Sequence, residues 1–374
     1  MVSDKTISIK RRKLTKKKKK KKKRTLTSSS SSPSLPTLPF DLIPEILCRL
    51  PVKFLLQFRC ICKSWKSLIS DYKFAKKHLT LSTTHTLHCI SYRDNAHVLL
   101  NSYSLDYVLT NITQTQFPSP PDSYLFVGSC NGILCLVREG TDVVHLQLWN
   151  PSIRKFKELP PISTPQTFVS LYGFGYDPII DNYKVVVVYS DLNRKMELKV
   201  HTLGTDSWKT VSEFPFAFVS AQRPGQYVSG TINWLVSTGI KWFITSFDLG
   251  NECYQEVLLP DDPCKVDENK LSLSIFRACL CMISGENVWV MKEYGNEESW
   301  TKLFTISYLR VPRASSYSYI MAECVLENEQ VLLTYNEDER FGHISYNYKN
   351  DTSKFIELEN FPEICVESLI SPCF

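Results

Sequence analysis

Carboxylate, histidine and cysteine side chains are the groups in this sequence that could do chemistry, but their types and spacing give little sign of catalysis. Asp177 and Asp181 flank a turn containing Pro178, where they could hold a cation, but turn carboxylates are common without any metal. His85 and His88 have no third ligand nearby. The motifs H-E-x-x-H, G-x-S-x-G and G-x-x-x-x-G-K-[ST] are absent. We therefore predict no catalytic residue, no metal site and no cofactor.

The thirteen cysteines favour buried free thiols over a zinc site. Their number is odd, no C-x-x-C occurs, and the closest pairs have a single residue between them. These pairs are Cys60 with Cys62 and Cys279 with Cys281. This usage is typical of a reducing compartment.

Charge is distributed unevenly along the chain. Residues 1–24 hold fourteen Lys or Arg and one acid, a charge of +13, whereas the whole chain carries +6, so the remainder carries −7. We predict that residues 1–37 form a disordered basic and Ser-rich tail. The basic runs 10–13 and 16–23 favour nuclear import, with weak salt-dependent RNA binding as the alternative. We expect no secretory leader and no membrane partner, and a nuclear or cytoplasmic location.

Residues 38–79 contain a dense helical pattern that must position any binding surface. Asp41 can cap a first helix, Pro44 falls in its first turn, and Pro51 ends it. Residues 52–60 and 62–69 predict a second and a third short helix. Three short helices cannot pair all these apolar faces with one another, so the surplus indicates a docking face. The apolar positions of the first helix are Leu42, Ile43, Ile46, Leu47 and Leu50.

This stretch resembles an F-box, through L-P-F-D-L-I-P-E-I-L-C-R-L-P-V-K-F-L-L-Q-F-R-C-I-C-K-S-W. Gln57 stands where the family has Arg, Ile61 where it has Val, and Phe54 fills a site often held by Ser. The resemblance implies docking to a Skp-family subunit, which links to a cullin and a RING subunit. The docking residues it implies are Leu38, Pro39, Ile46, Leu47, Leu50, Pro51, Val52, Ile61 and Trp65.

Residues 80–374 predict a β-rich region with an internal repeat. A strand ends, a polar turn follows, and an aromatic residue recurs seven positions on. Tyr103, 46 residues before Trp149, begins a degenerate sixth copy in this interpretation. The predicted pairs are Trp149 with Phe156, His201 with Trp208, and Phe247 with Tyr254; in two further copies Glu293 precedes Trp300 and Tyr348 precedes Phe355.

A period near 50 residues with one hairpin per copy is typical of a kelch-like propeller; an irregular β-sandwich is the alternative. Trp149, Trp208, Trp234 and Trp300 fit blade core better than ligand platforms. The region also resembles the F-box-associated domain of the plant F-box/kelch-like family. The matching pieces are S-C-N-G-I-L-C-L (129–136), L-W-N-P-S-I-R-K-F-K-E-L-P (148–160), G-F-G-Y-D-P (173–178) with D-N-Y-K-V-V, and S-G-T-I-N-W-L (229–235).

We therefore predict an α+β multidomain chain, with a small three-helix F-box at 38–79 and an all-β, propeller-like domain at 80–374 that recruits a protein substrate. The function implied is that of a non-catalytic adaptor in an SCF-type ubiquitin ligase. The alternatives are a propeller enzyme or glycan-binding protein with a helical cap, and a nuclear RNA-binding protein. The sequence names no substrate-binding residue, but loops are candidates at 160–170, 214–228, 260–272 and 308–319.

Overall fold

Four short helices open the part of the chain that the computed structural model describes. That part is 42–373 without 94–96, 105–111, 117–123, 141–142, 164–167, 191–195, 215–219, 222–223, 261–270, 309–310, 312–318, 327–328, 338–339 and 359–361. The predicted tail, Leu38, Pro39 and Asp41 lie outside it. The helices are α1 (Leu42–Leu47), α2 (Val52–Phe58), α3 (Lys63–Ile69) and α4 (Tyr72–Leu81).

The helix α4 is additional to the three helices predicted from the sequence. Asp71 caps it, because its side chain accepts a hydrogen bond from the Phe74 N–H at 3.0 Å. Its buried face contains Phe74, Ala75 and His78, and His78 Nε2 donates to the Leu50 carbonyl at 2.9 Å. Burial lowers the pKa of His78, so the neutral ring acts as a polar cross-link between α4 and the end of the first helical segment. Among the described residues, no helix has the length and apolarity needed to span a bilayer.

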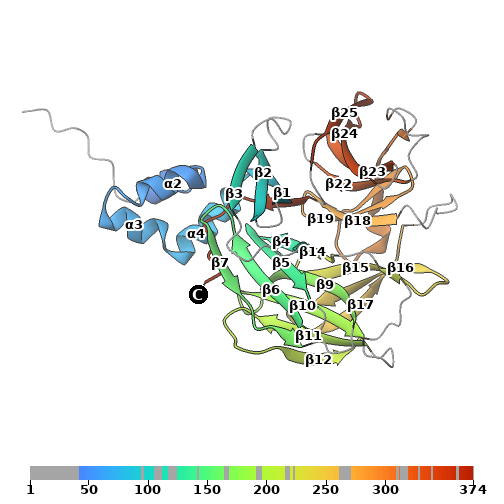
Figure 1. The fold of residues 1–374 in the computed structure, drawn as a ribbon, viewed down its shortest axis with the longest axis horizontal. Coiled ribbons are helices and arrows are strands. Elements are labelled where there is room, and N and C mark those ends of the chain that lie inside the picture. The colour runs from blue at the N-terminus through green and yellow to red at the C-terminus, as the bar shows by residue number, and fades with distance from the viewer. Residues whose placement is uncertain are drawn as a thin grey trace, which may run out of the picture. The chain divides into compact units, whose positions relative to one another are not determined.

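The rest of the described chain forms six antiparallel sheets, the blades of a propeller (Figure 1). Blade 1 contains β26 (Glu363–Val366), β1 (His85–Arg93), β2 (His97–Ser104) and β3 (Ile112–Gln116). Blade 2 contains β4 (Leu125–Cys130), β5 (Ile133–Glu139), β6 (Val143–Asn150), β7 (Lys155–Glu158) and β8 (Ile162–Ser163). Blade 3 contains β9 (Phe168–Asp177), β10 (Asn182–Ser190), β11 (Met196–Thr202) and β12 (Lys209–Glu213).

The other three blades repeat this order. Blade 4 contains β13 (Ser220–Ala221), β14 (Gln226–Val228), β15 (Thr231–Ser237), β16 (Trp242–Asp248) and β17 (Cys253–Val257). Blade 5 contains β18 (Leu271–Phe276), β19 (Cys279–Ser284), β20 (Asn287–Met291) and β21 (Trp300–Thr305), with the 3-10 helix η3 (Glu297–Ser299). Blade 6 contains β22 (Tyr319–Val325), β23 (Gln330–Glu337), β24 (Arg340–Asn347) and β25 (Thr352–Ile356).

The C-terminal strand β26 closes the ring by pairing with β1, with His88 opposite Glu363 and His85 opposite Val366. Closure removes an open sheet edge from blade 1. Buried apolar clusters then fill the spaces between neighbouring blades. Leu198 of blade 3 and Trp234 of blade 4 share one cluster, and Val288 of blade 5 and Leu333 of blade 6 share another. The propeller prediction is therefore confirmed.

In blades 1 to 4 the predicted repeat corresponds to the next-to-last residue of the third strand. Tyr103 holds this place in β2, so it marks a sixth blade as expected. Trp149 lies opposite Phe156, Phe247 lies opposite Tyr254, and the rings of His201 and Trp208 are 5.2 Å apart.

In the last two copies the predicted spacing does not match the strand register. Trp300 lies opposite Met291 rather than Glu293, because η3 lengthens the turn before β21. Phe355 lies opposite Ile344 rather than Tyr348, and the equivalent blade position is Tyr346. The spacing of seven residues fails in blade 5 because the turn is longer, whereas in blade 6 it is kept between Tyr346 and Ser353 and the predicted copy is displaced by two residues.

The turn between β18 and β19 stores strain that a glycine should relieve. Arg277 and Ala278 both have positive φ, at 50° and 60°, whereas the matching turn before β5 ends in Gly132. A left-handed conformation costs a residue with Cβ about 1–2 kcal/mol. Glycine removes this cost, but it also raises the conformational entropy of the unfolded chain, which offsets part of the gain in stability. We expect Ala278→Gly to raise the free energy of unfolding by about 0.5–1 kcal/mol in urea titration. The reverse change, Gly230→Ala, should lower it, and equal stability of both variants would contradict the strain.

Candidate docking surface of the helical module

The helices α1 to α3 expose large apolar side chains that a small module would normally bury. Ile61, in the turn between α2 and α3, is 61% exposed, and Ile46 and Phe54 are each 47% exposed. Isolated exposed apolar residues are ordinary on protein surfaces, but three of them within sixteen residues make this segment unusually apolar on its exposed side chains. We call Ile46, Phe54 and Ile61 the apolar triad.

Packing inside the module holds these helices in place. Leu55 is fully buried, and Val52 and Ile69 are 2% exposed. Phe58 of α2 and Trp65 of α3 make an edge-to-face contact, with centroids 5.5 Å apart and planes at 71°. The α2–α3 turn that carries Ile61 is therefore fixed on both sides by packed aromatic rings.

The residues predicted for docking divide by burial. Ile46, Pro51 and Ile61 are exposed, and Leu50 and Trp65 are half-buried. Leu47 and Val52 are buried at 3% and 2%, so here they support the surface from within. Leu38 and Pro39 lie outside the described residues. Phe54 was not among the predicted docking residues, although its unusual size at a position often held by Ser was a usable signal.

Two exposed cysteines flank Ile61, so thiol alkylation can probe this surface. Cys60 and Cys62 are both free and exposed. The hydrogen bond with the Ser64 hydroxyl, together with the backbone N–H of Trp65, holds the pKa of the Cys62 thiol below its usual range. Alkylation of Cys62 therefore reports whether this turn is covered.

Four basic side chains close in sequence to the apolar triad are exposed. They are Arg49, Lys53, Lys63 and Lys66. Charges at the rim of an apolar patch steer a partner of opposite sign and contribute more to association rate than to affinity. The surface therefore fits a partner with apolar pockets bordered by acidic residues.

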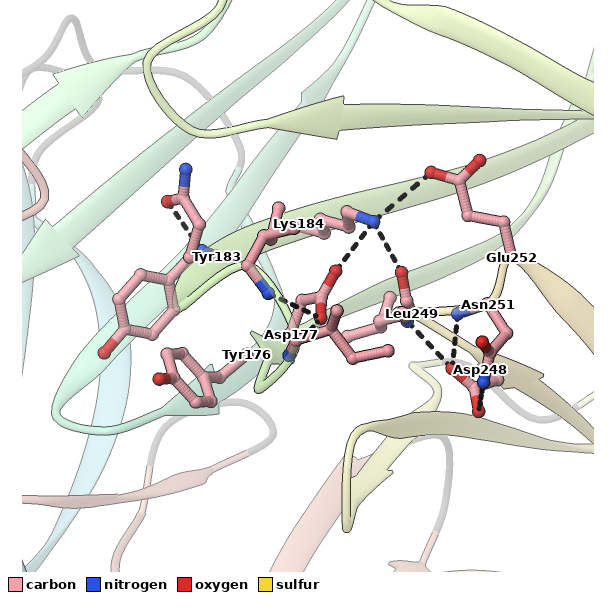
Figure 2. Close-up of polar contacts among 12 residues, drawn as sticks. Tyr176, Asp177, Tyr183, Lys184, Asp248, Leu249, Asn251 and Glu252 are labelled. Carbon is pink, nitrogen blue, oxygen red and sulfur yellow. Dashed lines mark hydrogen bonds and ion pairs between the residues drawn. The ribbon is translucent and has the colours of Figure 1, made fainter.

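The carboxylates that could have held a cation are occupied by side chains of the protein. Asp177 is fully buried; its Oδ1 accepts the Ile179 N–H at 2.8 Å and its Oδ2 pairs with Lys184 Nζ at 2.9 Å (Figure 2). Lys184 also donates to the Leu249 carbonyl at 2.5 Å and lies 3.2 Å from Glu252 Oε1. Within the described ranges, no cluster of three or more His, Cys, Asp or Glu side chains could hold a metal ion.

Two of the four tryptophans predicted to lie in the blade core are buried, and the other two are half-buried. Trp149 and Trp234 are 2% and 0% exposed. Trp208 and Trp300 are half-buried, and their indole N–H groups donate to the carbonyls of Pro160 and Leu258 at 2.7 and 3.1 Å. These indole N–H groups are already used inside the propeller.

The candidate substrate loops 160–170, 214–228, 260–272 and 308–319 lie partly outside the described residues. The topology nevertheless relates the strands that they connect. Each loop follows the outer strand of one blade and leads into the inner strand of the next. Equivalent strands run in the same direction in every blade, so the strand ends that flank these loops lie at one end of the ring.

Comparison with known families decides what the helices and blades are. Residues 35–77 match the F-box domain, and residues 78–371 match the F-box associated beta propeller domain. The chain belongs to the F-box proteins with an associated propeller. This F-box protein is 33% identical over 292 residues to an F-box/kelch-repeat protein of Arabidopsis thaliana, covering 72% of this chain and 79% of the relative. It is 27% identical over 387 residues to the F-box protein CPR1 of the same plant, covering 90% and 89%.

Among solved structures, a chain of a nidogen/laminin complex matches with a TM-score of 0.45 and 11% identity, over 76% of this chain and 99% of that chain. Identity this low does not carry function from that protein to this F-box protein.

Proposed function

We propose that this F-box protein is the substrate-recognition adaptor of an SCF-type ubiquitin ligase. Its helical module docks on a Skp-family subunit, and its propeller recruits a protein target. The observation that carries the proposal is the exposed apolar triad, with exposed basic residues close to it in sequence, on a module that matches the F-box domain. The adaptor performs no chemistry of its own in this proposal.

In this proposal the adaptor accelerates ubiquitin transfer to the target by holding the target close to the conjugating enzyme. The Skp-family subunit links to a cullin and a RING subunit, which bring the charged ubiquitin-conjugating enzyme to the complex. A target held on the propeller meets the thioester at a high effective concentration, because a bimolecular encounter becomes an intramolecular one. The chain therefore needs two separate binding surfaces and a fixed relation between them.

Ile61→Asp tests the docking surface without disturbing the fold, since Ile61 is 61% exposed. Docking would place the new carboxylate in an apolar contact, and an unpaired buried charge costs several kcal/mol. We expect capture of a co-expressed Skp-family subunit by the full chain to weaken about 30-fold or more. Binding is measured by titration of the purified proteins.

Ile240→Asp is the matched control, because Ile240 is 91% exposed on blade 4. It should leave capture unchanged. The Skp-family subunit should also slow alkylation of Cys62 while leaving the exposed Cys253 of the propeller reactive. Capture of the Ile61→Asp chain at wild-type strength would remove this surface from the interface.

A further inference from the structure

A polar junction connects the last F-box helix to blade 3. Asp181, in the turn between β9 and β10, has φ of 54° and one carboxylate oxygen that receives three donors. Tyr72 and Lys76 of α4 supply two of them, with the Tyr72 hydroxyl at 3.0 Å, and Tyr176 of β9 supplies the third. We call Tyr72, Lys76, Tyr176 and Asp181 the α4 junction.

Lys76 is held from several directions at this junction. Its ammonium donates to Asp181 and, at 3.1 Å, to the Tyr176 hydroxyl. It also lies 5.1 Å from the ring centre of Tyr72 and 5.4 Å from that of Tyr176, within reach of cation–π attraction. The hydrogen bonds from Lys76 and Tyr176 lower the pKa of Asp181, so the carboxylate stays charged near neutral pH. An exposed ion pair alone contributes little, but a network of this kind restricts geometry.

A second contact lies at the C-terminal end of the closing strand. Glu367, directly after β26, donates its N–H to the Thr84 carbonyl at 2.9 Å and accepts the Ser82 hydroxyl on its own carbonyl at 3.0 Å. Burial raises the pKa of the Glu367 carboxyl, and the backbone N–H of Val52, the first residue of α2, opposes this rise. Two separate contacts remove the rotation that a single contact would allow.

We propose that the α4 junction is a positioning device that fixes the orientation of the F-box helices on the propeller, with Asp181 and Lys76 as its central pair. Residues 44–374 form one compact unit, as such a mount requires. The inference deepens the proposed function and rests on it for its purpose. A fixed mount would set where a target on the propeller stands relative to the ubiquitin-conjugating enzyme.

The positioning role of the α4 junction is tested by exchanging the charges of Lys76 and Asp181 in the full chain. Paramagnetic labels on unnatural amino acids replace the exposed Lys66 of α3 and Lys354 of β25, and pulsed spectroscopy measures the distribution of distances between them. We expect one narrow distribution in the parent chain. Lys76→Glu and Asp181→Lys should each broaden it by like-charge repulsion, and the double variant should restore it.

Lys73→Glu makes the same charge change at an exposed position of the same helix and should leave the distribution narrow. A broad distribution in the parent chain, unchanged single variants, or a double variant as broad as the single ones would each overturn the positioning role. If Lys76 only stabilised the local fold, the double variant with exchanged charges would not restore the narrow distance distribution.

A second measurement separates this inference from the proposed function. The ligase is assembled with its Skp-family, cullin and RING subunits but without a target, and ubiquitin attached to the lysines of the propeller itself is mapped. The single variants should change which of these lysines are modified, without weakening Skp capture. Unchanged ubiquitin sites in both single variants would overturn the role in presentation. Failure of the parent chain to capture any Skp-family subunit would contradict the proposed function, while the distance measurement would still test the mount.

Discussion

Lys184→Met should lower the free energy of unfolding by about 3–5 kcal/mol, the largest loss that we expect from one substitution in the propeller. The side chain of Lys184 is 5% exposed and that of Asp177 is fully buried, with 2.9 Å between Nζ and Oδ2 (Figure 2). Methionine keeps the length of the side chain but leaves the Asp177 carboxylate buried without its cation. Urea unfolding followed by tryptophan fluorescence measures the loss.

The loss of stability in Lys184→Met is large because all three protons of the Lys184 ammonium have acceptors. Its three protons are directed to Asp177, to the Leu249 carbonyl and to Glu252, so blade 3 and blade 4 are joined by one charged group. Burial alone would raise the pKa of Glu252, but the hydrogen bonds from Lys209 and Lys184 lower it, so this carboxylate stays ionised. Removal of Lys184 therefore leaves the buried Asp177 without its cation, while Glu252 keeps its ion pair with Lys209.

Lys209→Met is the matched control. Lys209 binds the same Glu252, at 2.6 Å, but its side chain is 67% exposed, and such pairs contribute below about 1 kcal/mol. Adding Asp177→Asn to Lys184→Met should recover part of the loss, since the unpaired charge is then removed. Equal losses for Lys184→Met and Lys209→Met would show that burial does not set the cost.

The helices were predictable because their signals are local. Pro51 ends the first helical segment and stands directly before α2, where a proline needs no N–H partner. The Asp71 cap of α4 is equally local, yet no helix was predicted after residue 69. Local rules place starts and stops well, but they do not number short helices reliably.

Ring closure and the buried ion pair could not be predicted in the same way. The strand that closes blade 1 pairs Thr86 with Cys365, and no local pattern connects residues so distant. Lys184 precedes a run of four valines and reads as the edge of an apolar strand, while Glu252 is a turn residue 68 positions later. Only the stacking of blades 3 and 4 brings the two together.

The docking residues show the same limit at the level of single side chains. Leu47 and Ile46 are neighbours with identical hydrophobic character, yet one is 3% exposed and the other 47%. Helical periodicity places both on a broad apolar face, since a short helix in a small bundle is apolar over most of its circumference. Which of them a partner can reach depends on how α2 and α3 pack.

Glu363→Gln should remove a pH-dependent loss of stability of about 2–3 kcal/mol, the second-largest effect that we expect. Glu363 is half-buried on the closing strand β26, and desolvation raises its pKa to about 7, against hydrogen bonds from Ser129 that lower it. His88 lies directly opposite in β1, but burial lowers its pKa to about 3, so it supplies no countercharge near neutral pH. The carboxyl is therefore protonated in the folded chain under conditions where the unfolded chain has ionised.

The sign follows from the raised pKa. Between the ordinary glutamate value of 4.5 and about 7, the folded chain holds a proton that the unfolded chain has lost, so stability falls as pH rises through this window and then levels off. Urea unfolding at pH 5, 6, 7 and 8 should give a smaller difference between Glu363→Gln and the parent chain at pH 5 than at pH 8, with the variant more stable at pH 8. Parallel stability curves for the parent and Glu363→Gln would show that the closing strand carries no such proton.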